Sequence, residues 1–108
     1  MLWLGTARDD LRGFLADARQ VAGFQLWRVQ RGLEPNDWKP MPVVGLGVRE
    51  IRVRTDLEHR VIYLAKFNEA VYVLHAFQKR SQRTPKPDLD LARQRLRELL
   101  KRRRQRGR

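Results

Sequence analysis

The chain has 108 residues, of which 42% are hydrophobic and 8% aromatic, and it contains no cysteine. These values predict one globular domain and exclude disulfides, zinc–thiolate sites and cysteine nucleophiles. The first ten residues lack the apolar run of a signal peptide, and no window approaches the ~20 apolar residues of a membrane span. We therefore predict a soluble, cytoplasmic protein.

The formal net charge of +12 is concentrated near the carboxyl end of the chain. Residues 79–108 hold 13 Lys and Arg against three acidic residues, whereas residues 1–78 hold 11 against nine. This asymmetry indicates a polyanionic partner, either nucleic acid or an acidic protein. The alternative for the last eight residues is a solvated basic tail.

The amino-terminal third predicts a short strand and helices. Trp3 and Leu4 form the expected strand, which Gly5 ends. Apolar residues then recur with a helical period over residues 7–31, and Gly13 and Gly23 weaken this stretch. We expect a helical hairpin or one bent helix there. The prolines of residues 33–42 predict a loop.

Residues 47–54, 59–67 and 70–77 predict three strands, since the first alternates apolar and polar residues and the others are rich in β-branched and aromatic residues. The short connections, 55–58 and the two residues 68–69, predict an antiparallel meander. A last helix is expected to start near Thr84 or Asp88, to bury an apolar stripe, and to fray within residues 101–108. We expect an α+β fold in which the first helices cover one sheet face and leave the other free to bind a ligand.

Most catalytic motifs are missing from the sequence. His59 and His75 are the only histidines, and no carboxylate lies at ligand spacing from them, so we predict no metal site and no cofactor. "VGLGV" at 44–48 lacks the length and the lysine of a phosphate-binding loop. Ser81, the only serine, lies in an arginine-rich segment and is a poor nucleophile candidate.

Cations and hydroxyl groups gather instead where the predicted strands meet. Neighbouring strands lie about 4.8 Å apart, so one ligand can contact all three. RNA cleavage needs a base, positive charge on the developing phosphorane and an acid. Arginine supplies the charge, and a lysine crowded by arginines has a lowered pKa and suits proton transfer. The candidate catalytic residues are Arg52, Arg60, Lys79 and Arg80, with Tyr63 and His75 in reserve; Arg54 projects from the same face as Arg52.

Each candidate also has a structural interpretation. Arg52 can pair with Glu50 or Glu58 on a solvated sheet face, Tyr63 can be a core tyrosine, and His75 can be a hydrogen-bonded core residue. From spacing alone, the sequence predicts a small basic α/β domain that binds nucleic acid.

Several motifs resemble the HigB-like toxins, often of phage origin, of the RelE/ParE superfamily. They are Gly-x-Gly-Val-x-Glu-Ile-Arg at 45–52, an arginine and an apolar run ending in tyrosine at 59–63, and Leu-His-x-Phe-x-Lys-Arg-x-x-x-Thr-Pro at 74–85. "GFQLWRVQRG" at 23–32 is similar to the family's second helix. The resemblance implies a RelE-like fold, in which an N-terminal helical hairpin packs on a twisted antiparallel sheet and a C-terminal helix follows.

For function, the resemblance implies a type II toxin, a metal-independent endoribonuclease that cuts mRNA on the ribosome. The implied partner is a HigA-like antitoxin with a helix-turn-helix domain. At the positions that match the family's motifs, the resemblance implies Arg52, Arg60, Lys79 and Arg80 as the cations that act on RNA. It implies Arg83 and Lys86 as RNA contacts. Residues 1–101 are then the toxin domain, and residues 102–108 a disordered tail whose Arg102, Arg103 and Arg104 bind nucleic acid.

Two alternatives stay open. ParE-like relatives bind DNA gyrase and cleave no RNA, and a shared fold cannot separate the two activities. The third reading is a non-catalytic nucleic-acid-binding protein that acts through its arginine-rich tail.

Overall fold

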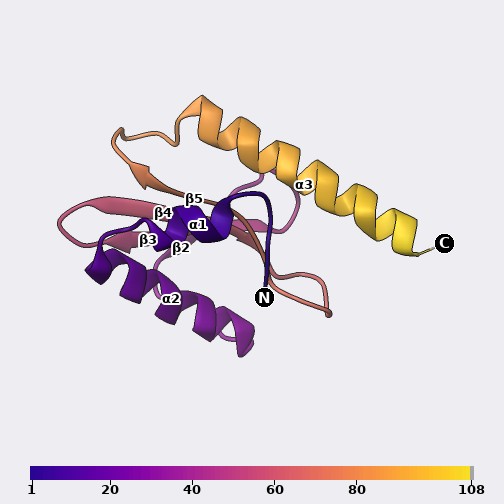
Figure 1. Ribbon diagram of the computed structural model, residues 1–108, viewed down its shortest axis with the longest axis horizontal. Helices are drawn as coiled ribbons and strands as arrows, with labels where there is room; N and C mark the ends of the chain where they lie inside the picture. Colours follow the sequence, from indigo (N-terminus) through magenta and orange to yellow (C-terminus); the bar gives the residue numbers. More distant parts are fainter. Residues whose placement is uncertain (108) are drawn as a thin grey trace.

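A computed structural model describes residues 1–107 as an α+β fold with a central sheet between helices (Figure 1). The strands are β1 (Leu2–Trp3), β2 (Trp38–Pro40), β3 (Val48–Arg54), β4 (Glu58–Leu64) and β5 (Tyr72–Lys79). The helices are α1 (Ala7–Arg12), α2 (Ala16–Gln30) and α3 (Lys86–Arg106). Among the described residues, no helix is both long and apolar enough to cross a bilayer.

The sheet is mixed, with strand order β1-β5-β4-β3-β2. β3, β4 and β5 form the predicted antiparallel meander, and β1 joins the edge of β5 in parallel. β2 pairs with β3 within the segment that we expected to be a loop. The β4–β5 connection covers residues 65–71, longer than the two residues predicted, because β4 already ends at Leu64 and β5 begins at Tyr72.

The structure shows two separate N-terminal helices and does not show the predicted helical hairpin or single bent helix. The helical conformation is interrupted between Arg12 and Ala16. Leu15 has an extended backbone there (φ −55°, ψ 151°), and the Phe14 side chain is buried in the core. Apolar residues of α1 and α2 pack on one sheet face, against Ile51, Val53 and Val61 among others. Each helix is therefore held by the sheet.

The opposite sheet face is not free, which corrects our expectation. Figure 1 shows α3 and α2 on opposite sides of the strands. Ala92, Leu96 and Leu99 of α3 are buried in a second core with Leu64 and Leu74. The apolar stripe of α3 needs a partner surface, and the apolar half of this sheet face supplies it.

Helix α3 continues to Arg106, where the sequence predicted fraying and a disordered tail. Arg103 explains part of this length, because its guanidinium forms an ion pair with Glu69 and lies 3.5 Å from the centre of the Phe67 ring. These contacts tie the last turns of the helix to the β4–β5 connection. Residue 108 lies outside the described part of the chain.

Candidate nucleic-acid interface

The strand register brings cations from three strands to one face of the sheet. Arg52 of β3 lies opposite Arg60 of β4. Two residues further along these strands, Glu58 of β4 lies between Arg54 of β3 and Lys79 of β5. Residues at alternate positions share a face, so all five side chains belong to the face on which α3 packs. They occupy the end of that face that the apolar stripe of α3 does not cover.

We name this group the strand-end cluster. Lys39 of β2 joins it, because its Nζ lies 3.8 Å from Oε1 of the fully buried Glu50. The members of the strand-end cluster are Lys39, Glu50, Arg52, Arg54, Glu58, Arg60 and Lys79.

Arg60 is the buried support of the cluster. Its side chain is 3% exposed, its Nε lies 3.2 Å from Glu50 Oε1, and its Nη2 donates to Glu58 Oε2 at 3.0 Å. Thr84 donates a hydrogen bond to the other Glu50 oxygen at 3.1 Å. A buried charge must be paired, and the Arg60 guanidinium is paired with Glu50 on one side and with Glu58 on the other. The sequence proposed Arg60 as a phosphate-binding cation, but its burial between two carboxylates gives it a supporting role instead.

Arg52 and Arg54 present guanidinium groups to solvent. Their side chains are 29% and 55% exposed, and each lies within 4 Å of Asp37, at 3.7 Å and 3.6 Å respectively. Arg54 also lies 3.6 Å from Glu58. Exposed ion pairs of this kind contribute about 0–1 kcal/mol, so a phosphate can compete for these groups. The partner of Arg52 is Asp37, whereas the sequence offered Glu50 or Glu58.

Lys79 has a different environment from the arginines. It is half-buried at the end of β5 and forms no ion pair within residues 1–107. Burial lowers the pKa of its ammonium group, and the nearby charges of Arg60 and Lys39 lower it further against the opposing effect of Glu50 and Glu58. The predicted lowering of the Lys79 pKa is thus present, although desolvation is its largest cause rather than crowding by arginines.

Tyr63 lies outside the cluster, on the opposite face. It is 1% exposed and belongs to the core beneath α1 and α2. Burial raises the pKa of its phenol, and the nearby Arg49 opposes that shift. Tyr63 therefore cannot act on a ligand held by Arg52 and Lys79, which corrects its candidacy for proton transfer.

His75 faces α3 and joins it to the sheet. Its Nε2 lies 2.6 Å from Asp88 Oδ1, and its ring stacks on Phe77 with a centroid separation of 5.0 Å. Arg95, buried beside it, donates to the Leu74 carbonyl at 2.8 Å. These contacts agree with the alternative of a hydrogen-bonded core histidine. Asp88 lies within the first turn of α3, which begins at Lys86.

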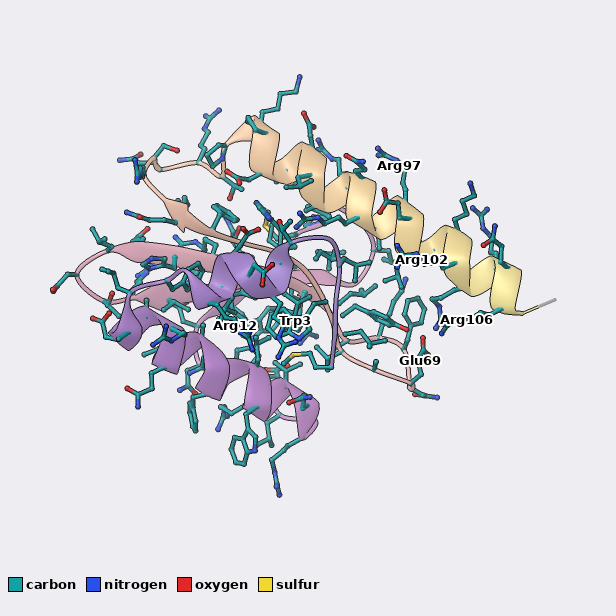
Figure 2. The ribbon with its side chains drawn as sticks, viewed as in Figure 1. Trp3, Arg12, Glu69, Arg97, Arg102 and Arg106 are labelled. Carbon is teal, nitrogen blue, oxygen red and sulfur yellow. The ribbon has the colours of Figure 1, made fainter. Side chains whose placement is uncertain are left out.

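The segment that follows Lys79 adds exposed cations beside the cluster. Arg80, Arg83 and Lys86 are all exposed. The hydrogen bond from Thr84 to Glu50 holds this segment against the cluster. Arg102, Arg103 and Arg104 belong to the other end of α3, which extends away from the strands (Figure 2). The structure thus divides the predicted RNA-binding cations into two groups.

Sequence reasoning missed Asp37 and Lys39, and it named Glu50 and Glu58 as partners of Arg52 only, whereas both pair with Arg60. One signal for Glu50 was available, because the alternation of β3 places it on the same face as Val48 and Arg52. An acidic residue between an apolar and a basic position needs a cationic partner if it is buried. Among residues 1–107, no group of three or more His, Asp or Glu side chains is placed to hold a metal ion.

The sequence of residues 9–97 matches the family model "Phage derived protein Gp49-like (DUF891)". This match covers most of the chain and includes every residue of the strand-end cluster. None of the curated proteins matches the chain.

Proposed function

The chain belongs to the phage-derived Gp49-like family, and from this membership and the strand-end cluster we propose that it is the toxin of a type II toxin–antitoxin system. The proposed activity is metal-independent endonucleolytic cleavage of mRNA during translation. The resemblance of residues 45–52 and 74–85 to HigB-like toxins supports this proposal, and the α+β fold is compatible with a RelE-like architecture.

One observation carries the proposal: Lys79, which has a lowered pKa and forms no ion pair among residues 1–107, lies on the same sheet face as the solvent-accessible guanidinium groups of Arg52 and Arg54. A phosphodiester needs positive charge on its non-bridging oxygens as the phosphorane develops, and arginine is well suited to supply it. A proton donor works best when its pKa approaches the ambient pH. Lys79 meets this requirement better than an ordinary surface lysine.

The reaction that we propose breaks the bond between phosphorus and the 5′-oxygen. The 2′-oxygen of the preceding ribose attacks phosphorus, and its proton passes to water. Arg52 and Arg54 bind the phosphoryl oxygens, and the Lys79 ammonium group gives its proton to the departing 5′-oxygen. The products are a 2′,3′-cyclic phosphate and a 5′-hydroxyl end. Arg60 holds Glu50 and Glu58 in place and acts only through them.

We propose that a HigA-like antitoxin with a helix-turn-helix domain holds the toxin inactive. The net charge of +12 makes an acidic partner surface favourable at long range.

The test is a cell-free translation reaction to which the purified protein is added. We expect protein synthesis to stop and new 5′-hydroxyl ends to appear within the translated region of a defined mRNA. The control variant is Arg8→Gln, which removes one exposed charge from α1, far from the cluster in the chain, and which should cleave like the unchanged protein. Intact mRNA with inhibited gyrase supercoiling would replace the proposal with the ParE-like function. Intact mRNA that is bound but uncut would leave a non-catalytic RNA-binding protein.

A further inference from the structure

A groove at the far end of α3 has a composition that the proposed reaction does not use. It lies between the carboxyl-terminal half of α3 and the β4–β5 connection, with a volume of about 720 Å³. Its lining residues are Lys66, Phe67, Arg97, Leu100, Lys101, Arg103 and Arg104. Within the described chain no acidic residue lines this groove. We name it the α3 groove.

The cations of the α3 groove form a straight row along the helix. Arg97, Lys101 and Arg104 are separated by four and three residues, so they lie on one face of α3. All three are exposed and none forms an ion pair in residues 1–107. At 1.5 Å per residue the row covers about 10 Å, the axial length of about three nucleotides in one strand of a duplex.

The aromatic ring of the groove is not available for base stacking. The Arg103 guanidinium lies 3.5 Å from the centre of the Phe67 ring, Lys66 Nζ lies 5.2 Å from it, and Tyr72 meets the ring edge-on. Single-stranded nucleic acid is usually bound through open aromatic faces, whereas a duplex is bound through its phosphates. A row of cations without an open aromatic face therefore favours the backbone of double-stranded RNA.

We propose that the α3 groove is a second RNA-binding site, which takes the phosphate backbone of a duplex RNA segment. It is separate from the strand-end cluster, which lies near the opposite end of α3, since Thr84, two residues before the helix, contacts Glu50. The protein then binds RNA at two places, with a scissile single strand at the cluster and a structured anchor at the groove. The second site does not depend on whether the cluster is catalytic.

A pair of arginines on α1 provides a matched control. Arg8 and Arg12 are also four residues apart and exposed, and neither forms an ion pair within residues 1–107. Replacing them removes the same charge as replacing Arg97 and Arg104, from a helix that belongs to neither proposed RNA site.

The experiment measures binding of a fluorescent 12-base-pair RNA duplex by anisotropy at several salt concentrations. Arg97→Gln with Arg104→Gln should weaken binding about tenfold and reduce the slope of log affinity against log salt by about two. Arg8→Gln with Arg12→Gln should change the affinity less than about twofold. Circular dichroism confirms that both variants are folded.

Equal losses in the two variants would overturn the proposal, because net charge alone would then explain binding. Unchanged duplex affinity in the Arg97/Arg104 variant would overturn it as well, and would leave the groove to an acidic protein segment. Cleavage of ribosome-bound mRNA at saturating protein should proceed at the same rate in both variants. That result separates failure of the groove from failure of the proposed reaction at Lys79.

Discussion

The two ends of one sheet face differ sharply in chemistry, although the same strands build both. Along the α3-facing side of β3 the residues are Val48, Glu50, Arg52 and Arg54. Val48 and Glu50 are fully buried, Arg52 is 29% exposed and Arg54 is 55% exposed. The apolar end is covered by α3, and the charged end is open. One strand therefore passes from the core to an open, charged surface within seven residues.

This comparison shows how a small domain keeps cations on a sheet without losing its core. The buried pair of Arg60 and Glu50 separates the apolar end from the open end. The Arg60–Glu50 pair packs beneath the exposed cations. The hydrogen bond from Thr84 to Glu50 fixes the neighbouring loop to this pair. The stabilising residues and the proposed working residues are thus adjacent but distinct, and variants should separate them.

Arg60→Ala should have the largest effect on stability. The substitution leaves the fully buried Glu50 without its closest cation, and the free energy of unfolding should fall by about 3–5 kcal/mol. Urea denaturation measures the loss. The double variant Glu50→Leu/Arg60→Met removes both charges and should recover most of it. A loss below about 1 kcal/mol in the single variant would contradict a supporting role for Arg60.

Leu96→Ala tests the covered end of the same face. Leu96 is 8% exposed and packs in the core between α3 and the sheet, so its truncation should cost about 2–4 kcal/mol. Leu46→Ala is the control, because Leu46 is 85% exposed and its truncation should change stability by less than about 0.5 kcal/mol. Equal stabilities of the two variants would mean that α3 does not cover this end.

Lys79→Met should have the smallest effect, and it should be stabilising. The pKa of Lys79 is lower in the folded protein than its ordinary value of 10.5, so folding disfavours the protonated amine. The resulting loss in the free energy of unfolding is complete at pH values below the folded pKa, where Lys79 is protonated in both the folded and the unfolded state. It decreases as the pH rises from the folded pKa towards 10.5. The variant should therefore be more stable near pH 7, and the difference should shrink at alkaline pH.

Thermal unfolding at pH 7 and at pH 10 checks this prediction. Lys101→Met, which removes an exposed charge from α3, is the control and should show no comparable gain. A Lys79→Met protein that is less stable than the unchanged chain at pH 7 would show that the ammonium group is stabilised by its neighbours.

The sequence predicted the parts of this fold that depend on local pattern. The β3–β5 meander follows from alternation and β-branched residues, and the helical content from the 3.6-residue period. β2 was missed because only three residues pair, one of them Pro40, and because Pro35 and Pro42 lie close on either side. The apolar stripe of α3 predicted a buried side but could not tell which sheet face it would cover.

The candidate site was only partly predictable, for a related reason. Residue parity along a strand places Arg60 and Tyr63 on opposite faces, and this rule alone excludes Tyr63 from the cluster. The burial of Arg60 depends on Glu50, Glu58 and the segment around Thr84, which is 24 residues away in the chain. No local pattern carries that information. For Lys79 the direction of the pKa shift was predicted from the neighbouring cations, but its largest cause, burial at the end of β5, was not.

The most direct test of the central claim compares Lys79→Ala and Lys79→Arg with the unchanged protein in cleavage of ribosome-bound mRNA at saturating protein. If Lys79 gives a proton to the departing oxygen, both variants should cleave at least about a hundredfold more slowly, because arginine keeps the charge but donates a proton poorly. Their affinity for the mRNA complex should change by no more than a few-fold. A Lys79→Arg protein that cleaves at the unchanged rate would contradict the account.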